Sequence, residues 1–343
     1  MTHILRQSAV AFGARLFFGS LLVFGPAISF AEAVTTIVDS QGFESPFVSG
    51  PLAGQFSWAA AGGGSTSATV QNSIVHSGSQ AVLVTRSPNS DKRFAVPGLT
   101  GTPSHRYVIV DWDMRVSQAT TGGGFGPFFG VDSYDESGPL AQLGVFGVDA
   151  STGELLYQTP DLVAVPDTLV PFNTWHHYRM VFDFGTDTYQ GYYDGVLQAS
   201  AGFIDGGPGV DQFSDADIAA FAAGIDSISQ GLTASAVFDN FRIINFQGDY
   251  NNDGVVNATD YTTWRTTFGN AVTPGSNADG NKNGVVDAGD YVIWRENQGL
   301  SLVGGAGSGA TLSSVLVPEP AGLVLLLLAI PAFLFRTTRR RDG

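Results

Sequence analysis

One 12-residue pattern occurs twice near the C-terminal end of the chain, and it constrains the fold more than any other feature of the sequence. The first copy reads DYNNDGVVNATD from Asp249 to Asp260, and the second reads DGNKNGVVDAGD from Asp279 to Asp290. Matching positions are 30 residues apart. A fixed period of this kind indicates an internal repeat, in which each copy forms one structural unit.

The oxygen-bearing residues of each copy have the spacing of a calcium-binding loop. A 12-residue loop supplies oxygen ligands from positions 1, 3, 5, 7, 9 and 12, with a main-chain carbonyl at 7 and glycine at 6. Each loop brings three carboxylates to one ion, so we expect two calcium ions. Magnesium fits less well, because it prefers octahedral sites and keeps several waters. The predicted ligands are Asp249, Asn251, Asp253, Val255, Asn257 and Asp260 in the first loop, and Asp279, Asn281, Asn283, Val285, Asp287 and Asp290 in the second.

A short amphipathic helix is expected after each loop. Tyr261, Trp264 and Phe268 have the spacing of one apolar helix stripe, and Gly269 follows as a C-terminal stop. The second copy repeats this pattern over residues 291–299. Because no full helix is expected before either loop, the unit is half of an EF-hand, used twice.

This pair of loop–helix units resembles the type I dockerin family across residues 248–299. The resemblance implies two calcium ions, two antiparallel helices and a cohesin-type protein partner. The tryptophan–arginine pairs of the two helices stand where many dockerins have Leu-Lys or Leu-Arg, which leaves open whether the partner is a cohesin or another surface protein. The resemblance also implies that loop positions 10 and 11 contact the partner, and these are Ala258, Thr259, Ala288 and Gly289.

Composition argues against several classes of function. The formal net charge of −15 argues against a nucleic-acid partner, whose binding needs a basic patch. The chain has no cysteine, which excludes disulfides, thiolate zinc sites and cysteine nucleophiles. Acidity instead suits cation binding.

The N-terminus has the order of a secretory signal peptide. Arg6 and Arg15 are followed by an apolar run over residues 16–28 and then by small residues that end at Ala33. We therefore expect residues 1–33 to be a signal peptide. A membrane anchor is the alternative, although the run is short for a bilayer span.

The C-terminal tail, residues 317–343, combines Pro318-Glu319-Pro320, an apolar stretch and a cluster of arginines. It resembles the PEP-CTERM sorting signal. The resemblance implies export in a Gram-negative-type bacterium, transient insertion of a hydrophobic helix in the membrane, and processing by an exosortase-type enzyme. The alternative is a retained single-pass anchor. Residues 300–316, rich in Gly and Ser, are interpreted as a flexible linker.

The large domain, residues 34–247, is expected to be built from strands. Residues 108–116 and 176–184 alternate apolar and polar side chains, which indicates strands with one buried face. Turn residues at 185–187 and 194–195 predict two hairpins, and residues 214–223 predict one capped helix. The expected fold class is mainly β, an antiparallel β-sandwich of the jelly-roll type, followed by the small α-helical module and a C-terminal hydrophobic helix.

Several segments of this domain are similar to concanavalin-A-like, LamG-type jelly rolls. They are residues 42–44, 172–178, 192–195 and 238–241. The family includes lectin-like binders, structural modules and glycan hydrolases, so the resemblance leaves the activity open.

Acid–base residues give no catalytic signature. The Glu-x-Asp-x-x-Glu string of laminarinase-type jelly rolls is absent, and Asp111 and Asp113 are expected to be solvated carboxylates on one strand face. His176 and His177 should point to opposite sheet faces and therefore not share an ion. The other histidines, His76 included, have no partner pattern. Glu44 and Asp239 are candidates for a structural calcium site.

Exposed aromatic rings could bind carbohydrate, because sugar faces stack on them. We expect two or three of the candidates to be exposed and the rest to lie in the core. The candidates are Trp58, Phe125, Phe128, Phe129, Tyr134, Tyr192 and Tyr193.

Together these features predict an exported, non-catalytic protein of the cell surface or extracellular space. Its jelly roll would bind polysaccharide or serve a structural role, and its calcium module would dock a protein. The alternative is a secreted polysaccharide hydrolase or lyase, which would need two carboxyl groups about 5–10 Å apart on one face.

Overall fold

The structure is a computed structural model that describes residues 36–95, 106–119, 125–224 and 226–303. The expected signal peptide, the sorting tail with Pro318, Glu319 and Pro320, and most of the linker lie outside these residues. Among the helices within the described ranges, none is long and apolar enough to cross a membrane.

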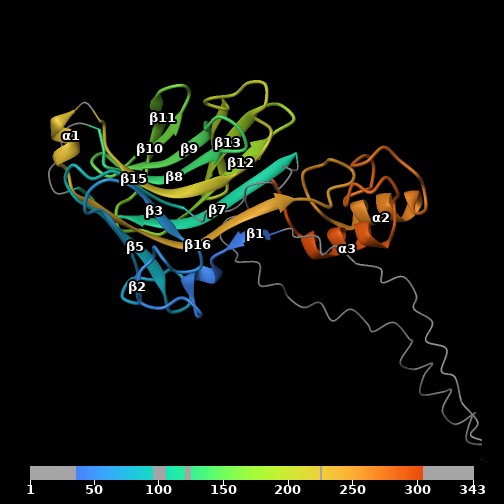
Figure 1. Ribbon diagram of the computed structural model, residues 1–343, viewed down its shortest axis with the longest axis horizontal. Coiled ribbons are helices and arrows are strands. Elements are labelled where there is room, and N and C mark those ends of the chain that lie inside the picture. Colours follow the sequence, from blue (N-terminus) through green and yellow to red (C-terminus); the bar gives the residue numbers. More distant parts are fainter. Residues whose placement is uncertain (1–35, 96–105, 120–124, 225, 304–343) are drawn as a thin grey trace, which may run out of the picture. The chain divides into compact units, whose positions relative to one another are not determined.

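Two antiparallel sheets form the large domain (Figure 1). Over the described residues, the first sheet has nine strands in the order β14-β13-β12-β7-β16-β5-β4-β2, with β1 paired to β16. The second has seven, in the order β11-β10-β9-β8-β15-β6-β3. The first sheet comprises β1 (Thr36–Asp39), β2 (Gly50–Pro51), β4 (Ser67–Gln71), β5 (Ala81–Arg86), β7 (Tyr107–Val116), β12 (His176–Asp183), β13 (Thr188–Tyr193), β14 (Val196–Gly202) and β16 (Ala234–Phe246). The second comprises β3 (Ala59–Gly62), β6 (Lys92–Ala95), β8 (Phe128–Asp135), β9 (Ala141–Asp149), β10 (Glu154–Gln158), β11 (Leu162–Leu169) and β15 (Asp215–Phe221).

The inner faces of the two sheets enclose one hydrophobic core. Val108, Val110, Trp112 and Met114 of β7 all point into it. The Trp112 ring stacks on Tyr178 of β12, with ring centroids 5.6 Å apart. This alternation of buried and outward residues confirms the predicted mainly β, antiparallel sandwich.

Residues 214–223 form a strand, so the predicted helix is wrong. They contain β15, which pairs with β6 on one side and β8 on the other. Ala216, Ile218 and Ala220 lie in the core, while Asp215 and Asp217 alternate with them and face outward. Alanine fits a helix as well as a small-residue strand, and the period of two emerges only once both neighbouring strands are in place.

The two hairpins predicted from turn residues are present. They join β12 to β13 and β13 to β14. Asp187 and Asp194, with φ of 52° and 46°, adopt the positive φ that tight hairpin turns require. The last strand of the sandwich in chain order is β16, which begins at Ala234.

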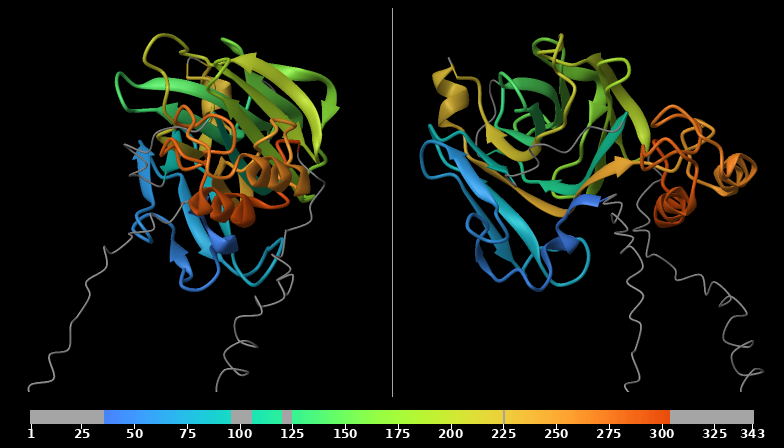
Figure 2. Two further views of the ribbon diagram at one scale, coloured as in Figure 1. Left: turned by 90° about the vertical axis from the view of Figure 1, so that its right-hand side faces the viewer. Right: turned by 45° about the vertical axis from the view of Figure 1, so that its right-hand side comes forward.

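Two helices, α2 (Ala258–Thr267) and α3 (Ala288–Asn297), lie side by side in the C-terminal module (Figures 1 and 2). The sequence predicts that each helix follows its loop. In the structure both helices begin inside the loop, at loop position 10. The reason is a reciprocal capping box, in which Asn257 and Asp260 each accept a main-chain hydrogen bond at the start of α2. The second copy has the same box.

The two copies are interlocked by exchange of their trailing segments. Val255 of the first loop pairs with Ser301, which follows α3, and Val285 of the second loop pairs with Ala271, which follows α2. Because Ala271 and Ser301 are one repeat apart, the two contacts are equivalent. Each loop is therefore held by the other copy.

The tryptophans of the two helices make a matching exchange. Trp264 Nε1 donates to the carbonyl of Asp287 at 2.8 Å, and Trp294 Nε1 donates to the carbonyl of Asn257 at 2.7 Å. Tyr261 packs against Trp294, with ring centroids 5.1 Å apart. Each indole thus fixes the helix start of the opposite copy.

We expect Trp264→Phe and Trp294→Phe each to destabilise the module by about 1 kcal/mol, because each change leaves one carbonyl without its donor. Urea unfolding in the presence of calcium, followed by helical circular dichroism, measures the effect. Trp175→Phe, in the sandwich, is the matched control. Equal stability of all three variants would contradict the role of the exchanged bonds.

Candidate functional site

The first loop is closed by bonds between its predicted ligands and its own main chain. Asp249 accepts from the N–H groups of Asp253 at 3.1 Å and Gly254 at 2.8 Å. Asn251 Oδ1 also accepts from Asp253, at 3.0 Å, and Asp253 Oδ1 accepts from Val255 at 2.9 Å. Short polar side chains of this kind bend the backbone into successive tight turns.

The second loop repeats these bonds one period later. Asp279 accepts from Asn283 at 3.1 Å and Gly284 at 2.8 Å, and Asn281 Oδ1 accepts from Asn283 at 3.0 Å. Asn283 Oδ1 accepts from Val285 at 2.8 Å. Gly284 has φ of 84°, as the turn position of such a loop requires. The sequence repeat is therefore also a repeat of geometry.

The last predicted ligand closes each loop onto its helix. Asp260 accepts from the N–H groups of Tyr250, Asn251 and Asn257 at 2.8, 3.0 and 2.8 Å, and it is fully buried. Asp290 makes corresponding bonds in the second copy. An aspartate here serves both the loop and the helix cap.

The donor set fits a calcium ion, because all twelve predicted ligand positions supply oxygen. Burial raises the pKa of Asp249, and the charges of Asp260 and Asp253 raise it further, against its main-chain hydrogen bonds. A divalent cation would offset this repulsion. Over the described ranges, however, no three His, Cys, Asp or Glu side chains converge to hold a metal ion. The carboxylates of the loops bond to N–H groups instead, so the two ions stay a prediction.

The four predicted partner-contact residues lie in the first turns of α2 and α3. Ala258, Thr259 and Ala288 are exposed, and Gly289 is half-buried. A Cβ at Gly289 would lie 2.6 Å from Nδ2 of Asn281, so that side chain would have to shift to admit one. The equivalent position of the first copy is Thr259, whose hydroxyl accepts from Asn251 Nδ2. The two helix starts therefore present similar but not identical surfaces.

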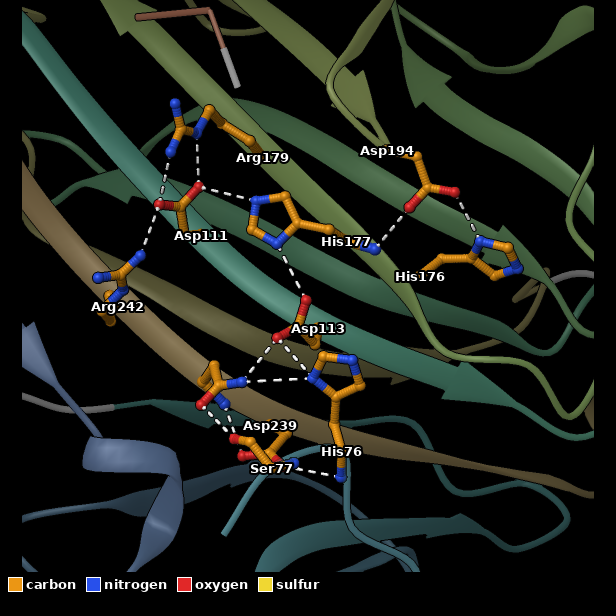
Figure 3. A network of polar contacts seen from close by, with 11 residues as sticks. His76, Ser77, Asp111, Asp113, His176, His177, Arg179, Asp194, Asp239 and Arg242 are labelled. Atoms are coloured by element: carbon orange, nitrogen blue, oxygen red, sulfur yellow. Dashed lines mark hydrogen bonds and ion pairs between the residues drawn. The ribbon is translucent and has the colours of Figure 1, made fainter. Parts of the chain in front are cut away.

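A second group of charged side chains lies on the outer face of the first sheet (Figure 3). Asp111 of β7 accepts two hydrogen bonds from Arg179, from Nε at 2.6 Å and Nη2 at 2.9 Å. Arg242 Nη2 lies 3.3 Å and His177 Nε2 3.5 Å from the same carboxylate. Burial disfavours the charged form, but Arg179 and His177 hold the pKa of Asp111 well below its usual range.

The negative charge of Asp113 is compensated by the other ring nitrogen of His177 and by two further side chains. Asp113 lies 3.0 Å from His177 Nδ1 and 3.1 Å from His76 Nδ1, and it accepts from Asn240 Nδ2 at 2.7 Å. His177 therefore bridges two buried carboxylates. Burial opposes its charge, but the hydrogen bonds to Asp111 and Asp113 prevail and raise the pKa of His177 to about 9.

This network corrects two expectations from the sequence. Asp111 and Asp113 are buried, at 1 % and 6 % exposure, and not solvated. His76, expected to have no partner, contacts Asp113 from 37 residues away in the chain. Pairs this distant in sequence leave no local pattern. The expected separation of the adjacent histidines is confirmed, since His176 bonds Asp194 and His177 faces Asp111.

Glu44 and Asp239, the candidates for a structural calcium site, anchor one loop. Glu44 accepts from the N–H groups of Ser79 at 2.6 Å and Gln80 at 2.8 Å. Asp239 accepts from the N–H groups of residues 76 and 77 at 3.0 and 3.1 Å. Their carboxylates are thus occupied by the main chain.

The aromatic candidates for carbohydrate contact divide into two groups, and none is fully exposed. Four are buried in the structure: Trp58, Phe128, Phe129 and Tyr192. Three are half-buried: Phe125, Tyr134 and Tyr193.

An antiparallel sandwich followed by a duplicated loop–helix pair defines a modular protein with a small helical module at its C-terminal side. Residues 247–295 of this chain match the family model of the Dockerin type I domain. Domains of this type bind calcium and imply a cohesin-type partner. No curated protein matches the chain.

Several solved structures are similar to the sandwich. A cellulose-induced protein, Cip1, is 15% identical, with 58% of this chain and 97% of that chain covered and a TM-score of 0.42. An endo-β-1,4-glucuronan lyase from the fungus Trichoderma reesei is 13% identical, with 58% and 94% covered and a TM-score of 0.41. An alginate lyase from Aplysia kurodai is 14% identical, with 52% and 87% covered and a TM-score of 0.39. None of these assigns an activity to this chain.

Removal of calcium should unfold the module while the sandwich survives, because metal binding to a small domain is coupled to its folding. We expect a chelator to abolish the helical circular dichroism and shift the fluorescence of Trp264 and Trp294. Asp260→Ala combined with Asp290→Ala should reproduce this effect, and Asp187→Asn, in an exposed turn of the sandwich, should not. Chelation without any spectral change in the wild type would falsify the coupling.

The charged network should make stability depend on pH. Because the pKa of His177 rises from 6.5 to about 9 on folding, its contribution is complete below pH 6.5 and is lost as pH rises through about 9. We expect the unfolding free energy of the wild type to fall over this window by on the order of 2 kcal/mol more than that of His177→Gln. Denaturant titrations at pH 6 and pH 9 measure it. His76→Gln should keep most of the pH dependence of the wild type. An equal change of unfolding free energy with pH in the wild type and in His177→Gln would refute the stabilising role of His177.

Proposed function

We propose that this chain is an exported docking protein. Its module of residues 248–299 would bind calcium at both loops and a cohesin-type or other surface protein at the starts of α2 and α3. The observation that carries the proposal is the repeat of the same closing bonds in both loops, which holds two similar helix starts in place. Dockerin-containing proteins are typically extracellular or on the cell surface, which agrees with this role.

The β-sandwich is, on this proposal, a non-catalytic domain that contacts polysaccharide. The outer face of the first sheet argues against an acid–base pair there, because Asp111 and Asp113 are neutralised by Arg179, Arg242 and His177. The signal peptide and the tail with its exosortase-type processing belong to the same proposal. They would deliver the protein to the envelope or the extracellular matrix.

Cleavage of a polysaccharide is the competing function. Hydrolysis requires a carboxyl pair that is free to exchange protons with a substrate, in a groove that a sugar chain can enter. A lyase requires instead a general base that removes the proton next to a uronate carboxyl group. Incubation of the full chain with polysaccharides, followed by an assay for new reducing ends or unsaturated products, separates the two functions.

Partner binding is tested at the helix starts. Ala258→Arg combined with Ala288→Arg places two long cations on exposed positions whose side chains make no hydrogen bond among the described residues. We expect capture of the partner from the envelope fraction in calcium to fall at least tenfold, while calorimetry shows unchanged calcium uptake. Thr266→Arg, on an exposed part of α2 away from its start, is the matched control.

Two results would count against this function. Calorimetry that detects no uptake of calcium by the wild-type chain would remove the docking account. Equal capture by the double variant and the control would place the partner surface elsewhere.

A further inference from the structure

The outer face of the second sheet carries a compact group of acidic side chains, separate from the charged network on the first sheet. Asp132 of β8 lies directly opposite Asp217 of β15, and Tyr134 lies opposite Asp215. Arg93 of β6 comes from the next strand, opposite residue 219. Residues opposite one another on antiparallel strands have Cβ atoms about 5 Å apart and share a face. The three carboxyl groups are therefore close neighbours.

Among the described residues, only one of these acids has a hydrogen-bond partner. Asp132 Oδ2 accepts from Arg93 Nε at 2.5 Å and from the Tyr134 hydroxyl at 2.8 Å. Asp215 and Asp217 accept no hydrogen bond within the described structure, and one oxygen of each, like Asp132 Oδ1, is fully buried without a partner. Buried polar groups are almost always paired, and leaving one unpaired costs about 1–3 kcal/mol. Three such oxygens on one face indicate that a group outside the described residues completes them.

The charges of this group do not balance. Burial raises the pKa of Asp217, and Asp132 and Asp215 raise it further. Burial also raises the pKa of Asp215, with Glu136 and Asp132 adding to it, and of Asp132, against the opposing effect of Arg93. One arginine faces three acids, so the group retains protons near neutral pH. A protonated carboxyl both donates and accepts hydrogen bonds, as a sugar hydroxyl does.

An aromatic surface lies beside the acids. Phe221 stacks on Phe128, with ring centroids 4.5 Å apart and an interplanar angle of 19°. The Arg93 guanidinium lies 5.6 Å from the Phe221 centroid and 6.0 Å from that of Tyr134. A Cβ at Gly130 would lie 2.3 Å from the carbonyl oxygen of Phe146 and 2.6 Å from Phe128 Cζ, so the neighbouring strand and the ring together leave no room for a side chain there.

This surface is accessible at its edge. The Arg93 side chain is 36 % exposed, and Tyr134 and Phe221 are half-buried. Asp215 and Asp217 retain 8 % and 6 % exposure. A ligand that covers Arg93 and the rings would therefore reach the unpaired carboxyl groups.

We propose that the outer face of β6, β8 and β15 binds a neutral polysaccharide chain, whose hydroxyl groups pair with Asp132, Asp215 and Asp217 and whose sugar faces contact Tyr134 and Phe221. This site rests on the carbohydrate role proposed for the sandwich and gives it a location. A chain of uronates fits less well, because the Arg93 guanidinium is already paired with Asp132 and is not free to pair with a uronate carboxylate. A metal ion fits less well, because no three acidic or histidine side chains within the described ranges converge on one point.

Two substitutions at one position test the site in the full chain. Asp217→Asn keeps a donor and an acceptor, as in the protonated acid, whereas Asp217→Ala removes both. With xyloglucan, mixed-linkage β-glucan and galactomannan as neutral probes, we expect at least one to be retarded in affinity electrophoresis. Asp217→Asn should bind it within about threefold of wild type, and Asp217→Ala and Phe221→Ala at least tenfold more weakly. Asp187→Asn, in a turn of the first sheet, should bind like wild type.

Thermal unfolding of each variant shows whether a loss of binding reflects a loss of fold. Absence of binding to every neutral probe by the folded wild type would overturn the site, as would tighter binding of alginate or polygalacturonate. Equal affinity of folded Asp217→Ala and wild type would also overturn it. Release of sugar products by the wild type but not by Asp217→Asn would support the location and overturn the non-catalytic reading. Calcium uptake and partner capture on the same samples report the docking function separately.

Discussion

The carboxylate of Asp260 is buried and accepts three main-chain hydrogen bonds, and the C-terminal module depends on this arrangement and its copy at Asp290. The side chain closes the loop from one side and caps α2 from the other. Because the first turn of a helix carries unpaired N–H groups and a partial positive charge, a carboxylate at this position is stabilised before any ion arrives. The exchanged tryptophan bonds then tie each capped start to the opposite copy. The loops, the helices and the packing between the two copies therefore form as one unit.

Buried carboxylates also lie on both outer faces of the sandwich, and their charges are compensated differently on the two faces. On the first sheet Asp111 and Asp113 are paired with Arg179, Arg242 and His177, so both negative charges are compensated within this face. Arg179 also donates to the carbonyl of Ser301 at 2.7 Å, beyond the second loop–helix unit. Breaking a buried pair of this kind leaves an uncompensated charge, which costs far more than the pair contributes. The network is thus suited to holding structure, and poorly suited to exchanging protons with a substrate.

Local patterns in the sequence predicted those parts of the molecule whose contacts are local. The loops, their glycine turns and both hairpins depend on residues a few positions apart, and all appear in the structure where the spacing placed them. The helix starts moved because the capping box extends each helix into its loop. Residues 214–223 were mistaken for a helix because the neighbours that give Asp215 and Asp217 a common face, β6 and β8, are more than 70 residues away in sequence. The partners of Asp113 and the row that joins Arg93 to Asp217 depend on the same kind of long-range strand pairing. No composition or spacing rule could have found them without the sheet order.

The contrast between the two faces bears on what the sandwich does. If acids were retained on these strands only for solubility, they would point to water, yet those on both faces are buried. If they were retained only for stability, the acids of both faces would be paired with cations, yet within the described residues Asp215 and Asp217 have no cation or donor of their own. A cost of this kind persists where the unpaired group is completed by a group outside the described residues. The described acids of the first sheet are paired and those of the second are not, and the second face also presents an aromatic stack and an accessible arginine. The ligand contact of the sandwich would then lie on the second sheet, where carboxyl groups lack partners, and the charges that stabilise the fold would lie on the first sheet.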